Sequence, residues 1–322
     1  MHNAFGNNLG ENKAVYPKRL IPLRFIKSLS KDYQLYLLLL PAVLYIVIFK
    51  YVPMYGVQLA FKKYYASRGI WGSPWIGFEN FERFFTSYAF WRVIKNTVGI
   101  NLYELLVSFP APIMLALLLN HVKSNKFKRI VQTVTYAPHF ISTVVMVGML
   151  YIFLSPRNGI INQIVLLFTD KPIFFLGSSE WFKTIYVFSG IWQHAGWSAI
   201  VYLAALTSID TGLYDAAYID GCNRFQVVRH VDLPGITPVV VIMLILDLGK
   251  MMQVGFQKIF LMQNDLNLQA SEVISTYVYK IGLISGQFSY STAVNLFNTI
   301  VNILLLVTAN NLAKRVTDNS LW

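Results

Sequence analysis

The sequence has few charged residues and a single cysteine. Charged side chains make up 13% of the 322 residues, whereas a soluble domain usually carries about a quarter. With Cys222 alone, the chain can form neither an intrachain disulfide nor a thiolate metal cluster. No polar segment is long enough to fold as a separate globular domain. These absences disfavour a soluble protein and a disulfide-stapled one.

The usual signatures of an enzyme are also absent. The sequence contains no Walker A pattern, G-x-x-x-x-G-K-[ST], so ATP cleavage would require a separate subunit. His139, His194 and His230 show no metal-binding spacing such as H-E-x-x-H, and no nucleophile–base set accompanies them. We therefore predict no catalytic residue, no metal and no cofactor in this chain, which disfavours an intramembrane enzyme.

Hydrophobic residues account for 55% of the chain, and the mean hydropathy is +0.49. Several apolar runs reach about 20 residues, the length at which a helix crosses a bilayer. We predict an all-α membrane protein with six transmembrane helices, over 33–55, 96–119, 132–154, 184–207, 236–256 and 292–313. The net charge of +12 comes from basic residues at the edges of these runs, which fits a membrane better than nucleic acid.

The distribution of basic residues predicts the orientation. An even number of spans places both termini on one side. Lys and Arg are dense in the tail 1–32 and in the short loop 120–131, so we predict that this side is the cytoplasm. The predicted order is a cytoplasmic tail (1–32), a first helix (33–55), an outer loop (56–95), a core with the other five helices (96–313) and a cytoplasmic stub (314–322).

A charged loop, 208–235, interrupts the core on the predicted cytoplasmic side. Its first part, "SIDTGLYDAAYID", can form a short helix that carries Ala216 and Ala217 on one small-residue face. Gly221 then breaks the helix, with Asp220 before it as a turn or cap residue. A flat face of this kind lets another backbone approach closely.

The second part of the loop, "RFQVVRHVDL", predicts another short helix, after which Pro234 and Pro238 redirect the chain into the next span. The loop could alternatively lie on the membrane surface, but surface helices usually present Lys and Arg. This loop instead carries four acids: Asp210, Asp215, Asp220 and Asp232. A docking surface for another protein fits this charge better.

The loop resembles the "EAA" loop of permease subunits of bacterial binding-protein-dependent ABC importers. That pattern is Glu-Ala-Ala, three residues, Gly, and then an apolar-Leu-Pro. The matching residues are Asp215-Ala216-Ala217, Asp220-Gly221 and Leu233-Pro234. Asp215 replaces the usual Glu, and Cys222 stands where Ala is common. The resemblance extends to a polysaccharide-importing subfamily that includes alginate permeases, through 125–142, 255–264, 273–283 and 290–306.

The resemblance implies the fold of a type I ABC importer permease with a cytoplasmic coupling helix, in the bacterial inner membrane. It implies a second homologous permease, two ATPase subunits that bind ATP and Mg²⁺, and an extracytoplasmic solute-binding protein. The cargo would be an oligosaccharide or polysaccharide fragment, and a uronate such as alginate is one possibility. The implied coupling residues are Asp215, Ala216, Ala217, Asp220, Gly221 and Pro234.

Polar side chains inside apolar runs usually face a cavity, and sugar sites combine aromatic faces with polar groups. The candidates are Glu104, Trp192, Gln193, His194, Asp247, Lys250 and Gln253. Asp247 and Lys250, spaced i, i+3, could instead pair with each other, and Trp192 could anchor the chain at the outer interface. Three asparagines of the last span could join helices: Asn295, Asn298 and Asn302.

A protein of another class remains an alternative. A self-sufficient secondary transporter or channel for a small polar solute would also be an apolar helical bundle. Such a protein commonly contains an inverted repeat or a coupling-ion site. The sequence has no clear internal repeat, and this alternative leaves the loop 208–235 unexplained.

Overall fold

The computed structural model describes residues 33–317. Helices form nearly all of this range, which contains no β-strand, so the all-α prediction is confirmed. The chain divides into two compact units, one up to Gly56 and one from Val57 onward. The predicted tail 1–32 and the last residues of the predicted stub, 318–322, lie outside the described residues.

The first unit is a single apolar helix with a local change of pitch. It comprises α2 (Tyr33–Ile46), η1 (Val47–Tyr51) and α3 (Val52–Met54). Together with the whole of η2 (Tyr55–Phe61), these elements form a candidate membrane span over Tyr33–Phe61. Pro41 lies inside α2 without ending it.

The second unit opens with short elements where the sequence predicts an outer loop. These are η2 (Tyr55–Phe61), α4 (Gly69–Gly72) and α5 (Glu79–Phe85). The next span begins at Phe90, before the predicted residue 96, and runs through α6 (Phe90–Ser108) and α7 (Pro110–Asn120). Pro110 falls in the first turn of α7, a position where a missing N–H costs little.

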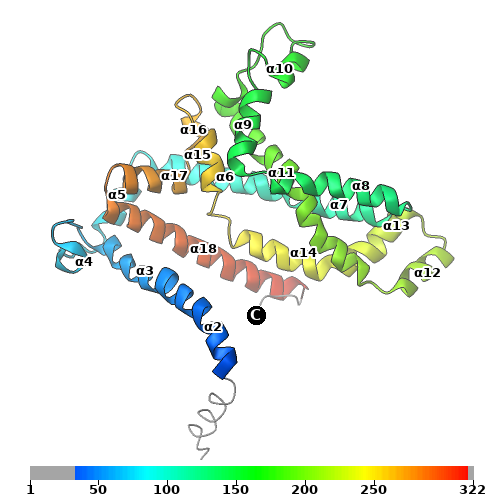
Figure 1. Cartoon of the computed structure of the whole chain (residues 1–322), viewed down its shortest axis with the longest axis horizontal. Helices are drawn as coiled ribbons and strands as arrows, with labels where there is room; N and C mark the ends of the chain where they lie inside the picture. Colours follow the sequence, from blue (N-terminus) through cyan, green and yellow to red (C-terminus); the bar gives the residue numbers. More distant parts are fainter. Residues whose placement is uncertain (1–32, 318–322) are drawn as a thin grey trace, which may run out of the picture. The chain divides into compact units, whose positions relative to one another are not determined.

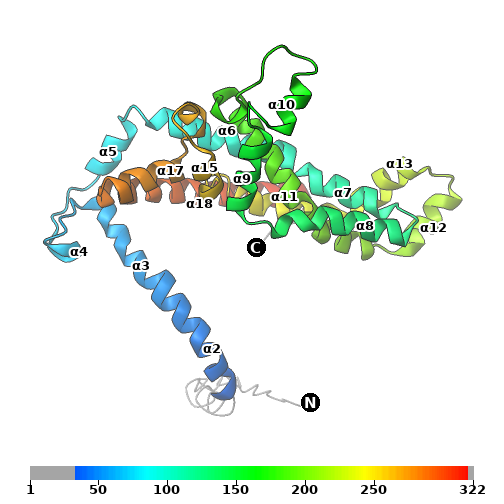
Figure 2. The same ribbon diagram turned by 45° about the horizontal axis from the view of Figure 1, so that its top comes forward.

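The span predicted over 132–154 is divided into separate helical elements in the structure. The structure has α8 (Asn125–Tyr136), η3 (Ala137–Phe140) and α9 (Thr143–Phe153), and the chain bends by 101° between η3 and α9. Pro138 removes a backbone donor just before the bend. Ser142 then caps α9 by accepting a 3.3 Å hydrogen bond from the Val145 N–H. Figure 2 shows the change of direction from α8 to α9.

After α10 (Ile160–Val165) and η4 (Phe175–Gly177), the long helix α11 (Ser179–Thr207) packs against α6, α7 and α8. Gly196 permits the contact with α8, because a Cβ there would collide with the backbone of Thr135. Apolar side chains of α7, α11 and α14 form a buried cluster: Ala116, Leu119, Ala199, Tyr202, Leu203, Leu206 and Ile236.

The loop at 208–235 contains a separate helix, α12 (Thr211–Ile219), followed by a turn at Gly221. The predicted redirection at Pro234 and Pro238 is wrong. α13 (Arg224–Val227), the π-helical turn η5 (Val228–Asp232) and α14 (Leu233–Leu248) instead form one continuous helical stretch. In a regular helix, a proline ring collides with the carbonyl of the residue four positions earlier. The wider π-helical turn η5 lies immediately before the part of the helix that contains Pro234. In Figure 1, α12 and α13 lie together at one end of the second unit.

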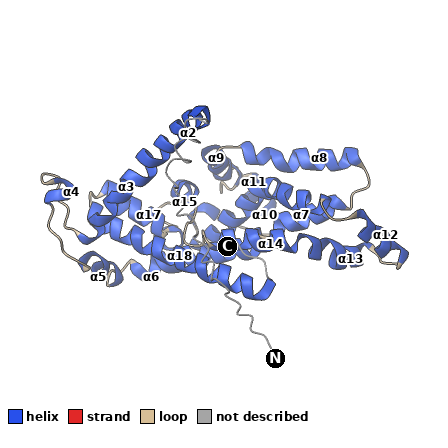
Figure 3. Cartoon of the chain, turned by 90° about the horizontal axis from the view of Figure 1, so that it is seen from below, coloured by secondary structure: helices blue, strands red, loops and turns tan. Residues whose placement is uncertain are grey.

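The helix α14 ends at Leu248, before the predicted residue 256. Short elements follow: α15 (Phe256–Met262), α16 (Leu268–Ser271), α17 (Ile274–Tyr279) and η6 (Lys280–Ile284). The last helix, α18 (Phe288–Thr317), packs against α14 and α17. Figure 3 shows how fully helices account for this part of the chain.

The structure does not confirm the count of six spans. Four helices of the described chain are long and apolar enough to cross a membrane, and the bent pair α8–α9 could supply a fifth. The helix α11 has 29 residues but is not among them. Polar residues in its middle, among them Gln193 and His194, lower its mean hydropathy.

Candidate functional site

A cavity of about 610 Å³, called the central cavity below, lies within the second unit. Its walls come from α6, α7, α9, α11, α14, α15 and the turn between α14 and α15. Polar side chains make up much of the lining: Asn101, Glu104, Ser108, Gln193, His194, Ser198, Asp247, Lys250, Gln253, Gln257 and Lys258. A polar cavity between apolar helices is suited to a hydrophilic solute.

The structure brings six of the seven pathway candidates together at the central cavity. They are Glu104, Gln193, His194, Asp247, Lys250 and Gln253. The seventh, Trp192, lines a separate apolar hollow of about 470 Å³ with Trp181 and Phe188. The structure therefore places six of the predicted residues around one cavity and Trp192 outside it.

The cavity contains acids and bases from different elements. Glu104 comes from α6, Asp247 from α14, Lys250 from the turn after α14, and Lys258 from α15. Within the described chain, no ion pair joins Asp247 to Lys250, although the Lys250 N–H donates to the Asp247 carbonyl at 3.0 Å. Both side chains also line the central cavity.

Lys258 is one of the polar cavity residues that were not predicted from the sequence, as are Asn101, Ser108, Ser198 and Gln257. Its Nζ donates a 2.6 Å hydrogen bond to the carbonyl of Tyr186 and lies 4.4 Å from the centroid of that ring. Gly190 leaves room for this arrangement, since a Cβ there would lie 3.3 Å from the Lys258 Nζ. Burial lowers the pKa of the Lys258 ammonium to about 8, and the charge of Glu104 acts in the opposite direction. The signal in the sequence was weak, because Lys258 lies in "GFQKIFLMQN", beyond the end of the predicted span 236–256.

Two other cavity residues are held by contacts at the break between α8 and α9. Gln193 is buried, and its Nε2 donates a 2.8 Å hydrogen bond to the Ile141 carbonyl, which has no regular helical partner at the break. His194 Nδ1 lies 3.2 Å from His139 Nδ1, and the His139 ring stacks on Trp197 with centroids 4.5 Å apart. Gln193 therefore connects the cavity wall to the break between α8 and α9, whereas His194 connects the same wall to the aromatic pair of His139 and Trp197.

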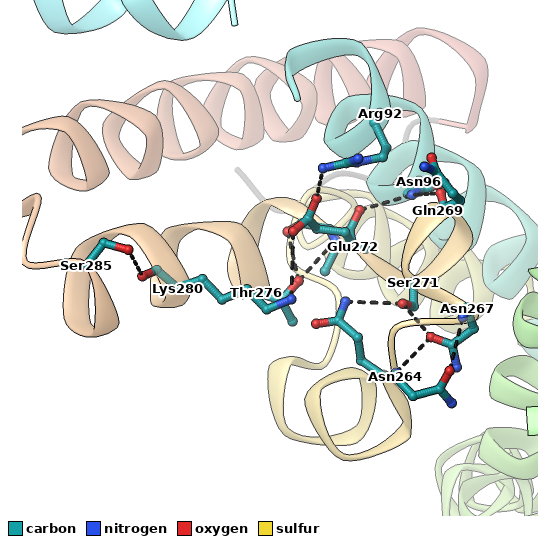
Figure 4. A network of polar contacts seen from close by, with 12 residues as sticks. Arg92, Asn96, Asn264, Asn267, Gln269, Ser271, Glu272, Thr276, Lys280 and Ser285 are labelled. Atoms are coloured by element: carbon teal, nitrogen blue, oxygen red, sulfur yellow. Dashed lines mark hydrogen bonds and ion pairs between the residues drawn. The ribbon is translucent and has the colours of Figure 1, made fainter. Parts of the chain in front are cut away.

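A polar network fastens the segment after α14 to α6 (Figure 4). The Nδ2 of Asn96 donates to the carbonyls of Gln269, at 2.8 Å, and Glu272, at 3.0 Å. The buried carboxylate of Glu272 forms an ion pair with Arg92 and lies 3.8 Å from the Nζ of Lys280. Because α15 belongs to this segment, the network also helps to fix the position of Lys258.

The last span contributes one asparagine contact of the predicted kind. The Asn302 Oδ1 accepts a 2.9 Å hydrogen bond from the Met252 N–H, which joins α18 to the turn after α14. Asn298 is buried, whereas Asn295 is exposed. Only Asn302 among the three is therefore seen to link elements within the described residues.

The helix α12 has the features of a docking element. Asp210 caps its start by accepting a 3.0 Å hydrogen bond from the Gly212 N–H, and Asp220 closes it before Gly221, whose φ of 77° favours glycine. No residue of α12 is buried. Large apolar side chains of α12 and α13 are exposed: Leu213, Tyr218, Ile219 and Phe225. Exposed apolar side chains that gather on one surface are a common feature of protein-interaction sites.

The predicted coupling residues lie in three parts of the structure: on α12, in the turn that ends it, and in the first turn of α14. Asp215 and Ala216 are exposed on α12, Ala217 is half-buried, and Asp220 and Gly221 form the turn that ends it. Pro234 lies apart from them, in the first turn of α14. The turn is therefore built as the sequence predicts, whereas Pro234 lies within a continuous helical stretch and does not redirect the chain.

Tyr214 is a residue of α12 whose side chain contacts the rest of the unit. Its hydroxyl donates a 2.6 Å hydrogen bond to Oδ1 of Asp232, a carboxylate with 0% exposure. Burial raises the pKa of the Tyr214 phenol to about 12, and the bond to the Asp232 carboxylate adds to the shift. The Nε2 of His121 lies 2.6 Å from the other carboxylate oxygen. The sequence analysis assigned no role to Tyr214 or His121.

Comparison with known proteins gives consistent matches over nearly the whole chain. The family described as "binding-protein-dependent transport system inner membrane component" matches residues 108–318. Protein LplB of Bacillus subtilis is 41% identical over 300 residues, 93% of this chain and 94% of that protein. The polygalacturonan/rhamnogalacturonan transport system permease protein YteP of the same organism is 43% identical over 305 residues, 95% of this chain and 94% of that protein.

Solved structures give the same match. One chain of a bacterial ABC transporter involved in the import of the acidic polysaccharide alginate superimposes with a TM-score of 0.85 at 40% identity. That match covers 91% of this chain and 99% of the other. A second alginate transporter structure, in complex with a periplasmic protein bound to alginate pentasaccharide, gives a TM-score of 0.86 at 38% identity, over 92% and 100% of the two chains.

Proposed function

Because the chain belongs to the family of inner membrane components of binding-protein-dependent transport systems, we propose that it forms part of the saccharide path of an ATP-driven importer. Membership of this family, together with several long apolar helices, indicates that the chain is a multi-pass protein of the inner membrane. The observation that carries the proposal is the central cavity, which presents polar and charged side chains from helices otherwise rich in apolar residues. Saccharide hydroxyls need such hydrogen-bond partners when they leave water.

The proposed cargo is an oligosaccharide from an acidic polysaccharide. Two lysines of the cavity, Lys250 and Lys258, support this cargo because a uronate carboxylate pairs well with an ammonium group. The aromatic pair of His139 and Trp197 adjoins the wall through His194 and offers apolar faces of the kind that sugar rings contact. Alginate and polygalacturonan, named for the relatives above, are both acidic.

The proposed energy source lies in other subunits. We propose that α12 docks on an ATPase subunit that binds ATP and Mg²⁺, with Asp215, Ala216 and Ala217 at the contact. The exposed apolar side chains of α12 and α13 support this docking. The turn at Gly221 supports a fixed angle between the docked helix and the span that follows. The ATP-driven closure of the ATPase pair would then move the spans.

The remaining partners follow from the same proposal. A second homologous permease would complete the path, and an extracytoplasmic solute-binding protein would deliver the saccharide. Both termini and α12 would face the cytoplasm, in agreement with the basic tail and the basic loop 120–131. The chain itself would carry out no chemistry.

The test is reconstitution of the complete complex in liposomes. This complex contains the chain, the second permease, the ATPase pair and the binding protein. We expect ATP-dependent uptake of a uronate oligosaccharide that requires the binding protein, and weaker uptake of a neutral oligosaccharide of equal length. Preferential uptake of the neutral sugar would remove the acidic cargo but leave the importer standing. Solute transport by the chain alone, without ATP, would instead favour a secondary transporter or channel.

A further inference from the structure

One buried carboxylate joins three elements at the end of the second unit where α12 lies. Asp232 is the last residue of the π-helical turn η5, immediately before α14, and its side chain is fully buried. A carboxylate in such a position is stable only if hydrogen-bond donors or charges surround it. The structure supplies them from α12 and from the end of α7.

The two carboxylate oxygens have different partners. Oδ1 accepts hydrogen bonds from the Tyr214 hydroxyl at 2.6 Å and from the Asn120 Nδ2 at 3.3 Å. Oδ2 lies 2.6 Å from the Nε2 of His121. Asn120 is the last residue of α7 and His121 follows it directly, so the carboxylate links α12, α7 and α14.

The contacts of α12 with the rest of the second unit are few. The helix has no buried residue. Beside it, the Ile209 side chain occupies the space next to Gly235, where a Cβ would collide with it. A helix with so little buried surface keeps a fixed direction only through specific contacts. The hydrogen bond from Tyr214 to Asp232 is the contact of α12 that reaches the buried carboxylate.

The helices joined by Asp232 also reach the central cavity. Glu104 lies on α6, which continues into α7 as one candidate span, and Asp247 lies near the far end of α14. The π-helical turn η5 is a wider turn of a kind frequent at functional sites. A displacement of α12 that passes through Asp232 would therefore act on both carboxylate-bearing walls of the cavity.

We propose that Asp232 is the positioning residue of energy coupling: its carboxylate ties α12 to α7 and α14, so that motion of α12 reaches the cavity. The inference rests on the proposed function and deepens it. The Tyr214 hydroxyl, the His121 imidazole and the Asn120 amide orient the carboxylate. Asp232 is not among the residues that line the central cavity.

The test compares Tyr214→Phe, Asp232→Asn and the double variant in the reconstituted complex. We expect each single variant to raise the number of ATP molecules hydrolysed per saccharide imported by about tenfold, because each removes a hydrogen bond to a buried charge or the charge itself. The double variant should be no worse than the more severe single variant, since both remove the same link. A control, Tyr88→Phe, removes one exposed phenol remote from α12 in sequence and should keep the wild-type ratio.

A second readout does not depend on saccharide transport. Cys222 is the single cysteine of the chain and directly follows Gly221 at the end of α12. A spin label on Cys222, in the assembled complex with cysteine-free partners, should become more mobile in both single variants while the yield of assembled complex is unchanged. Wild-type mobility together with a wild-type ATP-to-saccharide ratio would overturn the inference. Failure of the wild-type complex to import any saccharide would instead overturn the proposed function, and the label would still decide whether Asp232 positions α12.

Discussion

The ammonium of Lys258 on α15 donates a 2.6 Å hydrogen bond to the main-chain carbonyl of Tyr186 on α11. This bond uses one of the three donors of the ammonium, and the side chain also lines the central cavity. The lysine is thus held in place by a neutral group, so its charge is not cancelled by its closest hydrogen-bond partner. Under the proposed function, Lys258 is, with Lys250, a cation of the cavity that could pair with an acidic saccharide.

Replacing Lys258 by Met should therefore separate acidic from neutral cargo. Methionine keeps much of the length and apolar character of lysine but removes the charge. We expect uptake of a uronate oligosaccharide to fall by about tenfold, the effect of losing one hydrogen bond to a charged group. Uptake of a neutral oligosaccharide should change by less than about twofold, within the effect of an ordinary substitution. Uptake in proteoliposomes measures both, and an equal loss for the two sugars would contradict the assignment.

The same lysine predicts a pH dependence. Burial lowers the pKa of Lys258 to about 8, so the charged form predominates below this value and is lost as the pH rises through it. The ratio of uronate to neutral uptake should therefore decrease between about pH 7 and pH 9. Lys258→Arg is the matched control, because a guanidinium stays charged over this range, and its ratio should stay flat. A ratio that falls equally in Lys258→Arg would assign the pH effect to another group.

The sequence indicated several polar residues of the cavity, Lys250 among them, but not Lys258, for a physical reason. Glu104, Gln193 and Asp247 stand out because each interrupts an apolar run, where an unsatisfied polar group is costly. Lys258 lies beyond the end of such a run, where lysine is ordinary. Lys258 lines the cavity because of the tertiary contacts of the segment that carries α15.

The break between α8 and α9 shows the same limit for the fold. Pro138 predicts a bend, but proline alone fixes neither the angle nor the end of a helix. The 101° turn depends on partners from other parts of the chain, such as the Gln193 amide that satisfies the Ile141 carbonyl. The helical nature of the apolar runs was predictable because it depends on local composition, whereas the break depends on α11.

The turn at Gly221 predicts a loss of coupling in Gly221→Pro. The φ of Gly221 is 77°, whereas proline is fixed near −65°, and its ring removes the N–H that donates to the Tyr218 carbonyl at 3.1 Å. We expect normal membrane insertion, a more than tenfold loss of uptake (about 1.4 kcal/mol or more) and continued ATP hydrolysis. Gly221→Ala is the milder control, since no atom would crowd its Cβ and only the positive φ costs energy, about 1 kcal/mol. Equal behaviour of the two variants would argue against a role for the turn geometry.

The small-residue face of α12 predicts that Ala217→Arg blocks docking. Ala217 is half-buried on a helix with no buried residue, so a long charged side chain fits the isolated chain with little strain. The same side chain would obstruct a close protein contact. We expect the variant to insert normally but to copurify with less ATPase subunit and to lose uptake. Wild-type uptake by the Ala217→Arg variant would contradict the proposal that α12 docks on an ATPase subunit.

The network around Glu272 predicts a structural effect, distinct from the transport effects above. Glu272 is 5% exposed and forms an ion pair with Arg92, and its own carbonyl accepts from Asn96. In Glu272→Gln the carbonyl contact is retained but the Arg92 charge loses its counterpart. Removing one partner of a buried ion pair costs about 3 kcal/mol, which for a chain of this size lowers the unfolding midpoint by about 6 °C.

The matched control is Glu79→Gln, a substitution of the same chemistry at an exposed position of α5. Its unfolding midpoint should stay within about 2 °C of the wild type, as expected for a surface change. The measurement is thermal unfolding of the purified complex, followed by the preference between uronate and neutral sugar in proteoliposomes. Because the network positions the segment that carries Lys258, Glu272→Gln should also weaken this preference while leaving the ATPase contact intact. A stable Glu272→Gln complex with the wild-type preference would show that the segment is held mainly by its other bonds, those of Asn96 among them.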